Sequence, residues 1–198
     1  MRNKTVVLVA MAATVLATGV LTGCDAEPSA EPGTSAASTS TAAAPAPADS
    51  VPTDAQPKHG EASTGAGLTV SGVRIGSQAG FDRVVYDLGG SGMPGWVVRY
   101  TERAVQDGSG RELEVAGDSV LEVRITGSAY PFDSGVSPYA GPDPATDPAV
   151  PGIAGVSSPL VFEGISQSFI GVAGERPAFS VTALSNPTRL IVDIATAG

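Results

Sequence analysis

The side chains that most often carry out catalysis are scarce in this chain of 198 residues. It has one cysteine, Cys24, and one histidine, His59, and no lysine follows Lys58. A Ser-His-Asp or Cys-His arrangement needs an imidazole, and a zinc site needs imidazole or thiolate ligands. Neither site can be built from the residues after position 65. What remains is carboxylate chemistry, in which two acids lie about 5 to 9.5 Å apart across the scissile bond.

Carboxylates are too numerous after position 65 to mark a site by themselves. Fourteen Asp and Glu residues lie there, so a close pair is expected by chance. Asp133, Asp143 and Asp147 could offer oxygen ligands to calcium, but their spacing matches no calcium-loop motif. We therefore predict no enzyme activity, no metal site and no cofactor. A carboxylate-based hydrolase is the weakest alternative.

The one cysteine follows an apolar N-terminal segment. Arg2 and Lys4 give a positive start and residues 6–20 an apolar core, which is the pattern of a secretory signal. This core is shorter than the roughly 20 residues of a membrane-spanning helix. Residues 21–24 (LTGC) resemble the bacterial lipobox, which implies a diacylglycerol on the Cys24 sulfur and cleavage just before it. We predict a protein anchored by lipid to the outer, extracytoplasmic face of the cell membrane. An ordinary signal peptide is the alternative.

The segment after the cysteine has the composition of a flexible tether. Residues 24–65 are rich in Ala, Pro, Ser and Thr and show no apolar periodicity, so we predict disorder. Stretched to about 3.1 Å per residue, such a segment reaches on the order of 100 Å. Its hydroxyl groups could carry sugars. The predicted organisation is a signal peptide over 1–23, the lipidated tether over 24–65 and one folded domain over 66–198.

Charge and cysteine content restrict the partners and the sources of stability. The formal net charge is −9 at pH 7, which argues against nucleic acid as a partner because the phosphate backbone attracts basic proteins. A single cysteine cannot form a disulfide within the chain. The folded domain must therefore be stabilised by a hydrophobic core.

After residue 65 the sequence has the texture of an all-β domain. Short runs of β-branched and aromatic residues alternate with Gly, Pro, Asn and Asp, as in antiparallel sheets. The predicted strands are 68–75, 81–88, 95–101, 120–126, 160–172 with a break near Gly164, 178–184 and 189–195.

Alternation within these runs predicts one buried and one solvated face. In one run, Leu121, Val123 and Ile125 alternate with the charged residues between them. In another, Trp96 and Val98 alternate with Val97 and Arg99. Two antiparallel sheets packed as a β-sandwich meet this pattern, with Trp96 in the core. No segment predicts an amphipathic helix of three turns. The long stretch 127–159 is rich in Gly and Pro, and its aromatic residues predict that its first part packs on the sandwich.

Several charged residues have both a structural and a ligand-binding interpretation. Arg83 and Asp87 share one strand face, and so do Arg189 and Asp193, so they could pair across neighbouring strands. Alternatively, arginine forks hold carboxylates and aromatic rings stack on sugars. The candidate ligand-binding residues, all on predicted strands, are Arg83, Arg99, Arg189, Tyr86 and Tyr100.

Three segments carry a family resemblance: 80–88 (GFDRVVYDL), 94–100 (PGWVVRY) and 187–194 (PTRLIVDI). In this order after a lipobox, they resemble the AMIN-like domain of actinobacterial lipoproteins. The resemblance covers residues 66–198. It implies a β-sandwich in the cell envelope, and related AMIN domains are associated with targeting to peptidoglycan. The prediction is a non-enzymatic binding module for peptidoglycan or a wall-associated partner, and the alternative is a protein–protein adaptor of an envelope complex.

Overall fold

In the computed structural model of the chain, residues 50–196 are described. The predicted signal peptide, Cys24 and the tether up to residue 49 lie outside the described residues. The described part consists of twelve strands and one short helix. Their bounds are β1 Lys58–Gly60, β2 Gly67–Gln78, β3 Phe81–Ser91, β4 Gly95–Thr101, β5 Ala104–Val105, β6 Glu112–Leu113, β7 Ser119–Thr126, α1 Pro131–Ser134, β8 Ile153–Val156, β9 Leu160–Phe162, β10 Ile165–Val172, β11 Phe179–Leu184 and β12 Arg189–Ala195.

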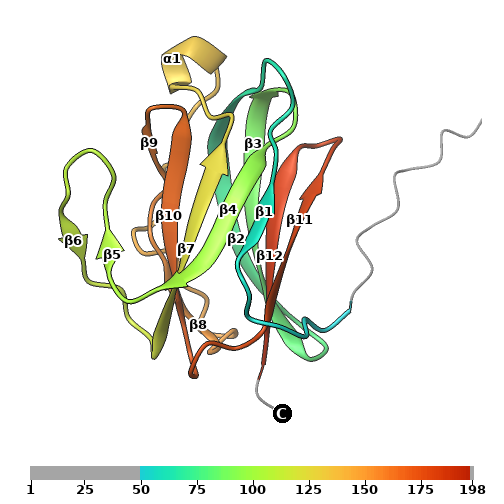
Figure 1. The fold of residues 1–198 in the computed structure, drawn as a ribbon, viewed down its shortest axis with the longest axis vertical. Coiled ribbons are helices and arrows are strands. Elements are labelled where there is room, and N and C mark those ends of the chain that lie inside the picture. The colour runs from blue at the N-terminus through green and yellow to red at the C-terminus, as the bar shows by residue number, and fades with distance from the viewer. Residues whose placement is uncertain (1–49, 197–198) are drawn as a thin grey trace, which may run out of the picture. The chain divides into compact units, whose positions relative to one another are not determined.

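The strands form two facing sheets and a separate hairpin. One sheet has six strands in the order β1-β4-β7-β10-β8, with β9 also paired to β10, and the other has four in the order β11-β12-β3-β2. Every strand pair is antiparallel. Figure 1 shows the two sheets packed face to face, with the β5–β6 hairpin standing beside the six-stranded sheet and α1 at one end. The predicted all-β antiparallel sandwich is confirmed.

The alternating side chains predicted to be buried form the core. Leu121, Val123 and Ile125 of β7 are at most 1% exposed, and they face Val84 and its neighbours on the opposite sheet. Trp96 is partly buried and packs against this cluster, as predicted, whereas Val97 is 37% exposed. Burial of these side chains is the main stabilising contribution in a domain without a disulfide.

The seven predicted strands are present with small shifts at their ends. The predicted break near Gly164 is the turn between β9 and β10, where Glu163 and Gly164 have φ angles of 46° and 79°. Short strands were missed. β1, β5, β6 and β8 contain two to four residues each, too few for a period-two pattern to be read.

The packed part begins earlier than the predicted boundary at residue 66. β1 pairs with β4, placing His59 opposite Val97, and so occupies the edge of the six-stranded sheet. In the segment before β1, the Asp54 carbonyl accepts a hydrogen bond of 2.9 Å from the Phe179 N–H. The ammonium of Lys58, the first residue of β1, lies 5.0 Å from the centroid of the Phe179 ring. The assignment of all of 24–65 to the tether is therefore wrong at its C-terminal end. Backbone hydrogen bonds hold this segment, and they leave no hydrophobic pattern in the sequence.

The stretch 127–159 is packed along the sandwich, and its first part does so as predicted. The Ala129 and Tyr139 N–H groups donate to carbonyls of β2 at 2.8 Å. Further on, Ala145 forms a bridge with Val156 of β8, which itself extends the six-stranded sheet. None of the helices in the described range 50–196 is long and apolar enough to span a bilayer.

Candidate functional site

The structure separates the five residues predicted to bind a ligand. Arg99 lies on the outer face of the six-stranded sheet, whereas Arg83 and Arg189 lie on β3 and β12 of the other sheet. Tyr86 is fully buried in the core, where its hydroxyl lies 3.2 Å from the Ser168 Oγ. It therefore cannot stand on a surface beside the arginines. The alternation that buries Val84 carries Tyr86 to the same face.

Tyr100 is half-buried and its hydroxyl is engaged. The hydroxyl donates a hydrogen bond of 2.7 Å to the Pro177 carbonyl, and the ring meets the edge of Phe179 with 5.6 Å between centroids. Burial raises the pKa of Tyr100 to about 12, against a lowering by the nearby charge of Arg176. This residue packs the end of the sandwich and offers no free donor.

The arginines of the four-stranded sheet take part in contacts within the protein. Arg83 faces Asp193 across β3 and β12 and donates to both carboxylate oxygens at 2.6 and 2.9 Å. This confirms one cross-strand pair predicted from the sequence. The other is different, because Asp87 accepts two bonds from Arg74 of β2 at 2.8 and 2.6 Å. Arg189 stands opposite Asp87 but donates to the Pro187 carbonyl at 3.3 Å.

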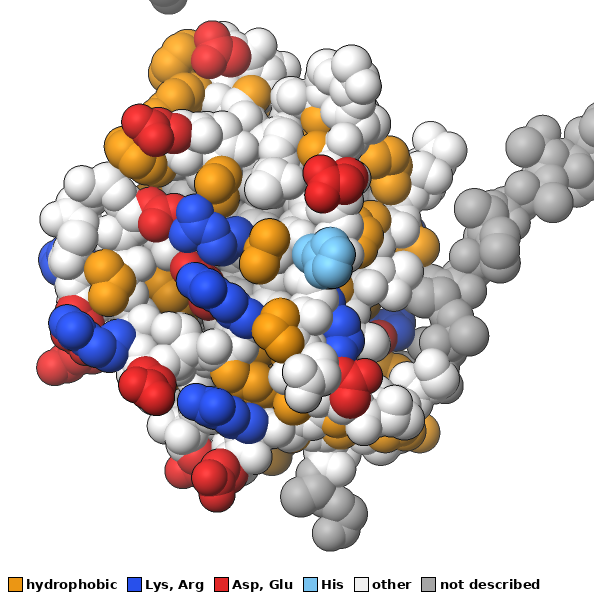
Figure 2. Space-filling view, in the orientation of Figure 1, with side chains coloured by type: hydrophobic (Ala, Val, Ile, Leu, Met, Phe, Trp, Pro, Cys, Tyr) orange, Lys and Arg blue, Asp and Glu red, His pale blue; other side chains and the backbone are white. Residues whose placement is uncertain are grey.

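Arg99 and three other arginines line a groove, which we call the arginine groove. This groove of about 610 Å³ lies between the outer face of β4 and β7 and the β5–β6 hairpin. Figure 2 shows basic side chains gathered over this face, with acidic side chains around them. The lining residues are Arg99, Tyr100, Thr101, Glu102, Arg103, Val105, Asp107, Glu122, Arg124 and Arg176.

Glu122 is the centre of a hydrogen-bonded network at the floor of the groove. This buried carboxylate accepts bonds from Arg99 Nε at 3.0 Å, Arg124 Nη1 at 3.2 Å and Gln167 Nε2 at 2.9 Å. Arg124 also contacts the Asp107 carboxylate at 2.8 Å. Gln167 accepts from the Asp107 N–H at 2.8 Å, so the network ties the β5–β6 hairpin to the sheet.

The network also fixes the charge of Glu122. Burial acts to raise the pKa of this carboxyl, but the hydrogen bonds from Gln167, Arg99 and Arg124 outweigh burial and leave the pKa below its usual range. A carboxylate hydrolase needs one acid whose pKa is raised, so that this acid is protonated and can give its proton to the leaving group. Glu122 is therefore unsuited to that role and suited to holding arginines in place.

Two guanidinium groups at the groove keep donors available for a ligand. Arg99 uses its Nε on Glu122 but has no partner for its terminal nitrogens within residues 50–196, and its side chain is 55% exposed. Arg176 is exposed and forms no ion pair with any described residue. Guanidinium groups of this kind bind carboxylates by charge-assisted hydrogen bonds. The sequence analysis missed Arg176, because it lies in a turn outside the predicted strands.

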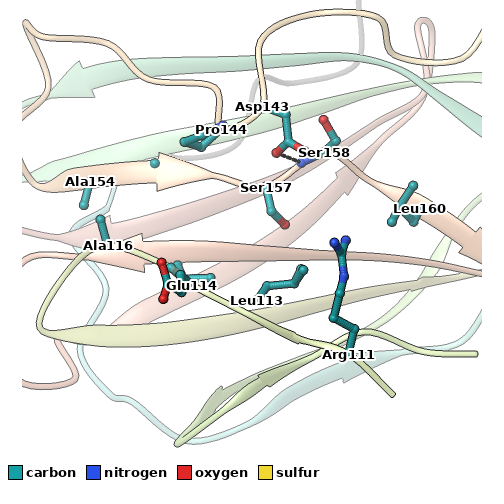
Figure 3. A pocket seen from close by; sticks show the side chains of 12 residues that line it. Arg111, Leu113, Glu114, Ala116, Asp143, Pro144, Ala154, Ser157, Ser158 and Leu160 are labelled. Atoms are coloured by element: carbon teal, nitrogen blue, oxygen red, sulfur yellow. Dashed lines mark hydrogen bonds between the residues drawn. The ribbon is translucent and has the colours of Figure 1, made fainter. Parts of the chain in front are cut away.

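A second, smaller recess lies between the chain after β6 and the β8–β9 connection. It has a volume of about 240 Å³, and its walls are largely apolar, including Leu113, Pro144 and Leu160. Figure 3 shows the Arg111 side chain extending into this recess, while the Asp143 carboxylate is turned to the Ser158 N–H, with a bond of 2.9 Å. The recess therefore presents one basic group, Arg111, and two acids, Glu114 and Asp143, of which Asp143 is held by the Ser158 N–H.

The described residues give no support to a calcium site in the loop. No group of three or more His, Cys, Asp or Glu residues within 50–196 is placed to hold a metal ion. Asp143 binds the Ser158 N–H, and Asp147 accepts a bond from the Ala149 N–H at 2.9 Å. Both carboxylates therefore shape the loop itself.

Fold and surface together define an all-β sandwich module with an arginine-lined groove on its outer face. The family model of the AMIN-like domain matches residues 68–196. Because this match covers more than half of the chain, the protein belongs to the AMIN-like domain family. No curated protein and no solved structure gives a significant match to the chain.

Proposed function

We propose that this protein is a lipid-anchored module of the bacterial cell envelope that binds its ligand without transforming it. Membership of the AMIN-like family supports the role of a binding module in the envelope. The lipobox-like residues ending in Cys24 support anchoring at the extracytoplasmic face of the membrane. The side-chain inventory supports a non-enzymatic role, since the chain has a single histidine, His59 on the edge strand β1, and this residue does not line the groove.

The ligand we propose for the arginine groove is a carboxylate-bearing component of the wall, such as the peptide part of peptidoglycan. The observation that carries this proposal is that Arg99 and Arg176 line the groove with available guanidinium donors. The terminal nitrogens of Arg99, which pairs with Glu122 through its Nε, have no partner within residues 50–196, and Arg176 forms no ion pair there. The acidic remainder of the chain limits unspecific attraction to the wall's anions.

We expect that the double variant Arg99→Ala/Arg176→Ala loses most of its binding to insoluble peptidoglycan. Each charge-assisted hydrogen bond to a carboxylate contributes roughly 1.5–3 kcal/mol, so the loss should be at least about tenfold in affinity. The measurement is co-sedimentation of the purified chain with peptidoglycan at several protein concentrations. The matched control is Arg74→Ala/Arg111→Ala, which removes the same charge from two other surface sites.

Equal sedimentation of both double variants would remove the arginine groove as the wall-binding site.

A second candidate function, an adaptor for an envelope protein, is favoured by one observation. Phe132 of α1 is 80% exposed and stacks on Tyr130 with 5.3 Å between ring centroids. If Phe132→Ser abolishes crosslinking to a partner in cells while wall binding persists, the adaptor function is the better description.

Lipid anchoring predicts that Cys24→Ser moves the protein from the membrane fraction to the soluble fraction. Two or more acyl chains anchor a protein stably, since each buried methylene contributes about 0.8 kcal/mol, and the variant has no thiol to acylate. The measurement is detergent-phase partitioning of the chain expressed in its own host. Partitioning that is unchanged in Cys24→Ser would exclude the anchor.

A further inference from the structure

The end of the sandwich away from α1 contains a pocket that differs from the arginine groove in charge. This end pocket has a volume of about 410 Å³ and is lined by residues of both sheets. One wall comes from β2, β3 and the end of β12, and the other from the segments 151–152 and 172–174. The lining residues are Ser77, Asp82, Pro151, Gly152, Val172, Ala173, Gly174, Ile194, Ala195 and Thr196.

Asp82 is a carboxylate at a position where the strand pattern calls for a core residue. On β3 it is in phase with Val84 and Tyr86, both fully buried, and it stands opposite Ser77 on β2 and Ile194 on β12. All of these side chains face the other sheet. The alternation therefore directs the carboxylate of Asp82 inward, into the end pocket, and away from the surface that carries Arg83.

This carboxylate is buried and has no partner within residues 50–196. Asp82 is 2% exposed, and no described residue donates a hydrogen bond to it or forms an ion pair with it. It packs so closely on the backbone of Gly152 that a Cβ at that position would collide with its Oδ2. Its oxygens are not fully enclosed, since the Ser166 Oγ alone is a fully buried side-chain atom without a hydrogen bond among the described residues. A ligand group in the end pocket can therefore reach the carboxylate.

The shape and lining of the pocket indicate which kind of ligand group could pair with the Asp82 carboxylate. Among the described residues, no Lys, Arg or His and no second acid lines the pocket. A divalent cation needs about six oxygen ligands, and one carboxylate with the hydroxyls of Ser77 and Thr196 falls short of that number. A guanidinium would bind both carboxylate oxygens side by side, but Oδ2 lies against Gly152. A compact ammonium needs one oxygen only.

We propose that the end pocket binds a primary ammonium group on a short aliphatic chain, held by the Asp82 carboxylate. The methylenes of such a ligand pack against Pro151, Val172 and Ile194, as lysine stems pack on apolar surface. The site is independent of the arginine groove and selects the opposite charge. A module with both sites recognises a carboxylate at one place and an amine at another.

The test is an NMR titration of the ¹⁵N-labelled full chain in detergent with butylammonium, with butanol and butyrate as neutral and anionic counterparts. We expect butylammonium alone to shift the amide signals of Gly152, Ala173 and Ala195. In Asp82→Asn, the affinity should fall by at least about tenfold, because the charge-assisted bond is lost while shape is kept. Glu175→Gln, which makes the same charge change on an exposed side chain nearby, should bind as the wild type does.

Gly152→Ala is the second variant, since its methyl group displaces the Asp82 carboxylate without changing any charge, and it should also weaken binding. A titration with N-acetyl-lysine amide distinguishes the source of the amine: tighter binding than butylammonium indicates a lysine side chain of a peptide, and weaker binding indicates a free amine. Equal shifts with butanol, or undiminished binding by Asp82→Asn, would overturn the proposal. Loss of peptidoglycan binding by the arginine variants leaves this result unaffected, so the two proposals fail separately.

Discussion

Replacing Glu122 by alanine should destabilise the domain by roughly 3–5 kcal/mol and release the β5–β6 hairpin from the six-stranded sheet. Removal of one partner from a buried ion pair leaves the other charges without compensation, which is the reason for an effect of this size. Here Arg99, Arg124 and Gln167 all lose their common acceptor. Chemical denaturation gives the change in free energy of unfolding, and hydrogen exchange of the hairpin amides shows whether the hairpin has come free.

The matched control for Glu122 lies on the hairpin itself. Glu112 pairs with Arg103 at 2.7 Å, but both side chains are more than half exposed, so Glu112→Ala should leave stability unchanged within error. If both variants lost the same stability, burial of the Glu122 network would not be the source of its contribution. The comparison separates a buried carboxylate from an exposed one in the same structural unit.

The Glu122 network also predicts the direction of the pH dependence. A carboxyl whose pKa is lowered on folding contributes stability that is present above its unfolded pKa and is lost as the pH falls through its folded pKa. The wild-type domain should therefore lose stability in acid, from about pH 4.5 downward. The variant Glu122→Ala should show a shallower loss over the same range.

Side-chain alternation was enough to predict the strands and the sandwich. In β7, Leu121, Val123 and Ile125 all face the core, because successive side chains of a strand point to opposite faces. The same rule also applies to Tyr86 and Asp82 of β3, but the prediction of candidate site residues did not use it there. The rule places Tyr86 in the core, where a ligand-binding role was predicted, and it directs the Asp82 carboxylate inward.

Other features could not be predicted, because their cause is pairing between segments far apart in the sequence. The strand order that puts Arg83 and Arg189 on one sheet and Arg99 on the other is set by tertiary contacts. A two-residue strand such as β5 has no period to detect. The arginine groove exists because the hairpin folds over the sheet, and its hydrogen bonds to Gln167 join residues about 60 positions apart.

A close backbone contact at one glycine is a further feature that could not be predicted from the composition. The Ala116 carbonyl packs directly on the backbone of Gly171 in β10, where any side chain would collide with it. This contact lets the chain after β6 lie flat on the outer face of the sheet, and so forms one wall of the recess that contains Arg111. In the sequence, Gly171 was one of 25 glycines and carried no signal.

Tyr86 provides the sharpest separation between a core role and a ligand-binding role. Tyr86→Ala should cost about 3–5 kcal/mol, because it removes the largest fully buried side chain and leaves a cavity between the sheets. Tyr86→Phe keeps the ring and removes only the hydroxyl bond to Ser168, so it should cost about 0.5–1.5 kcal/mol. Thermal and chemical unfolding measure both changes.

Peptidoglycan binding by the Tyr86 variants then decides between the two roles. If the tyrosine acts only in the core, Tyr86→Phe binds the wall as strongly as the wild type, since its hydroxyl is turned to Ser168 between the sheets and cannot reach a ligand. A fold that stays intact while wall binding is lost in Tyr86→Phe would contradict this assignment. It would mean that the sandwich opens along β10 to expose the hydroxyl, because no closed arrangement of the two sheets brings that oxygen to the surface.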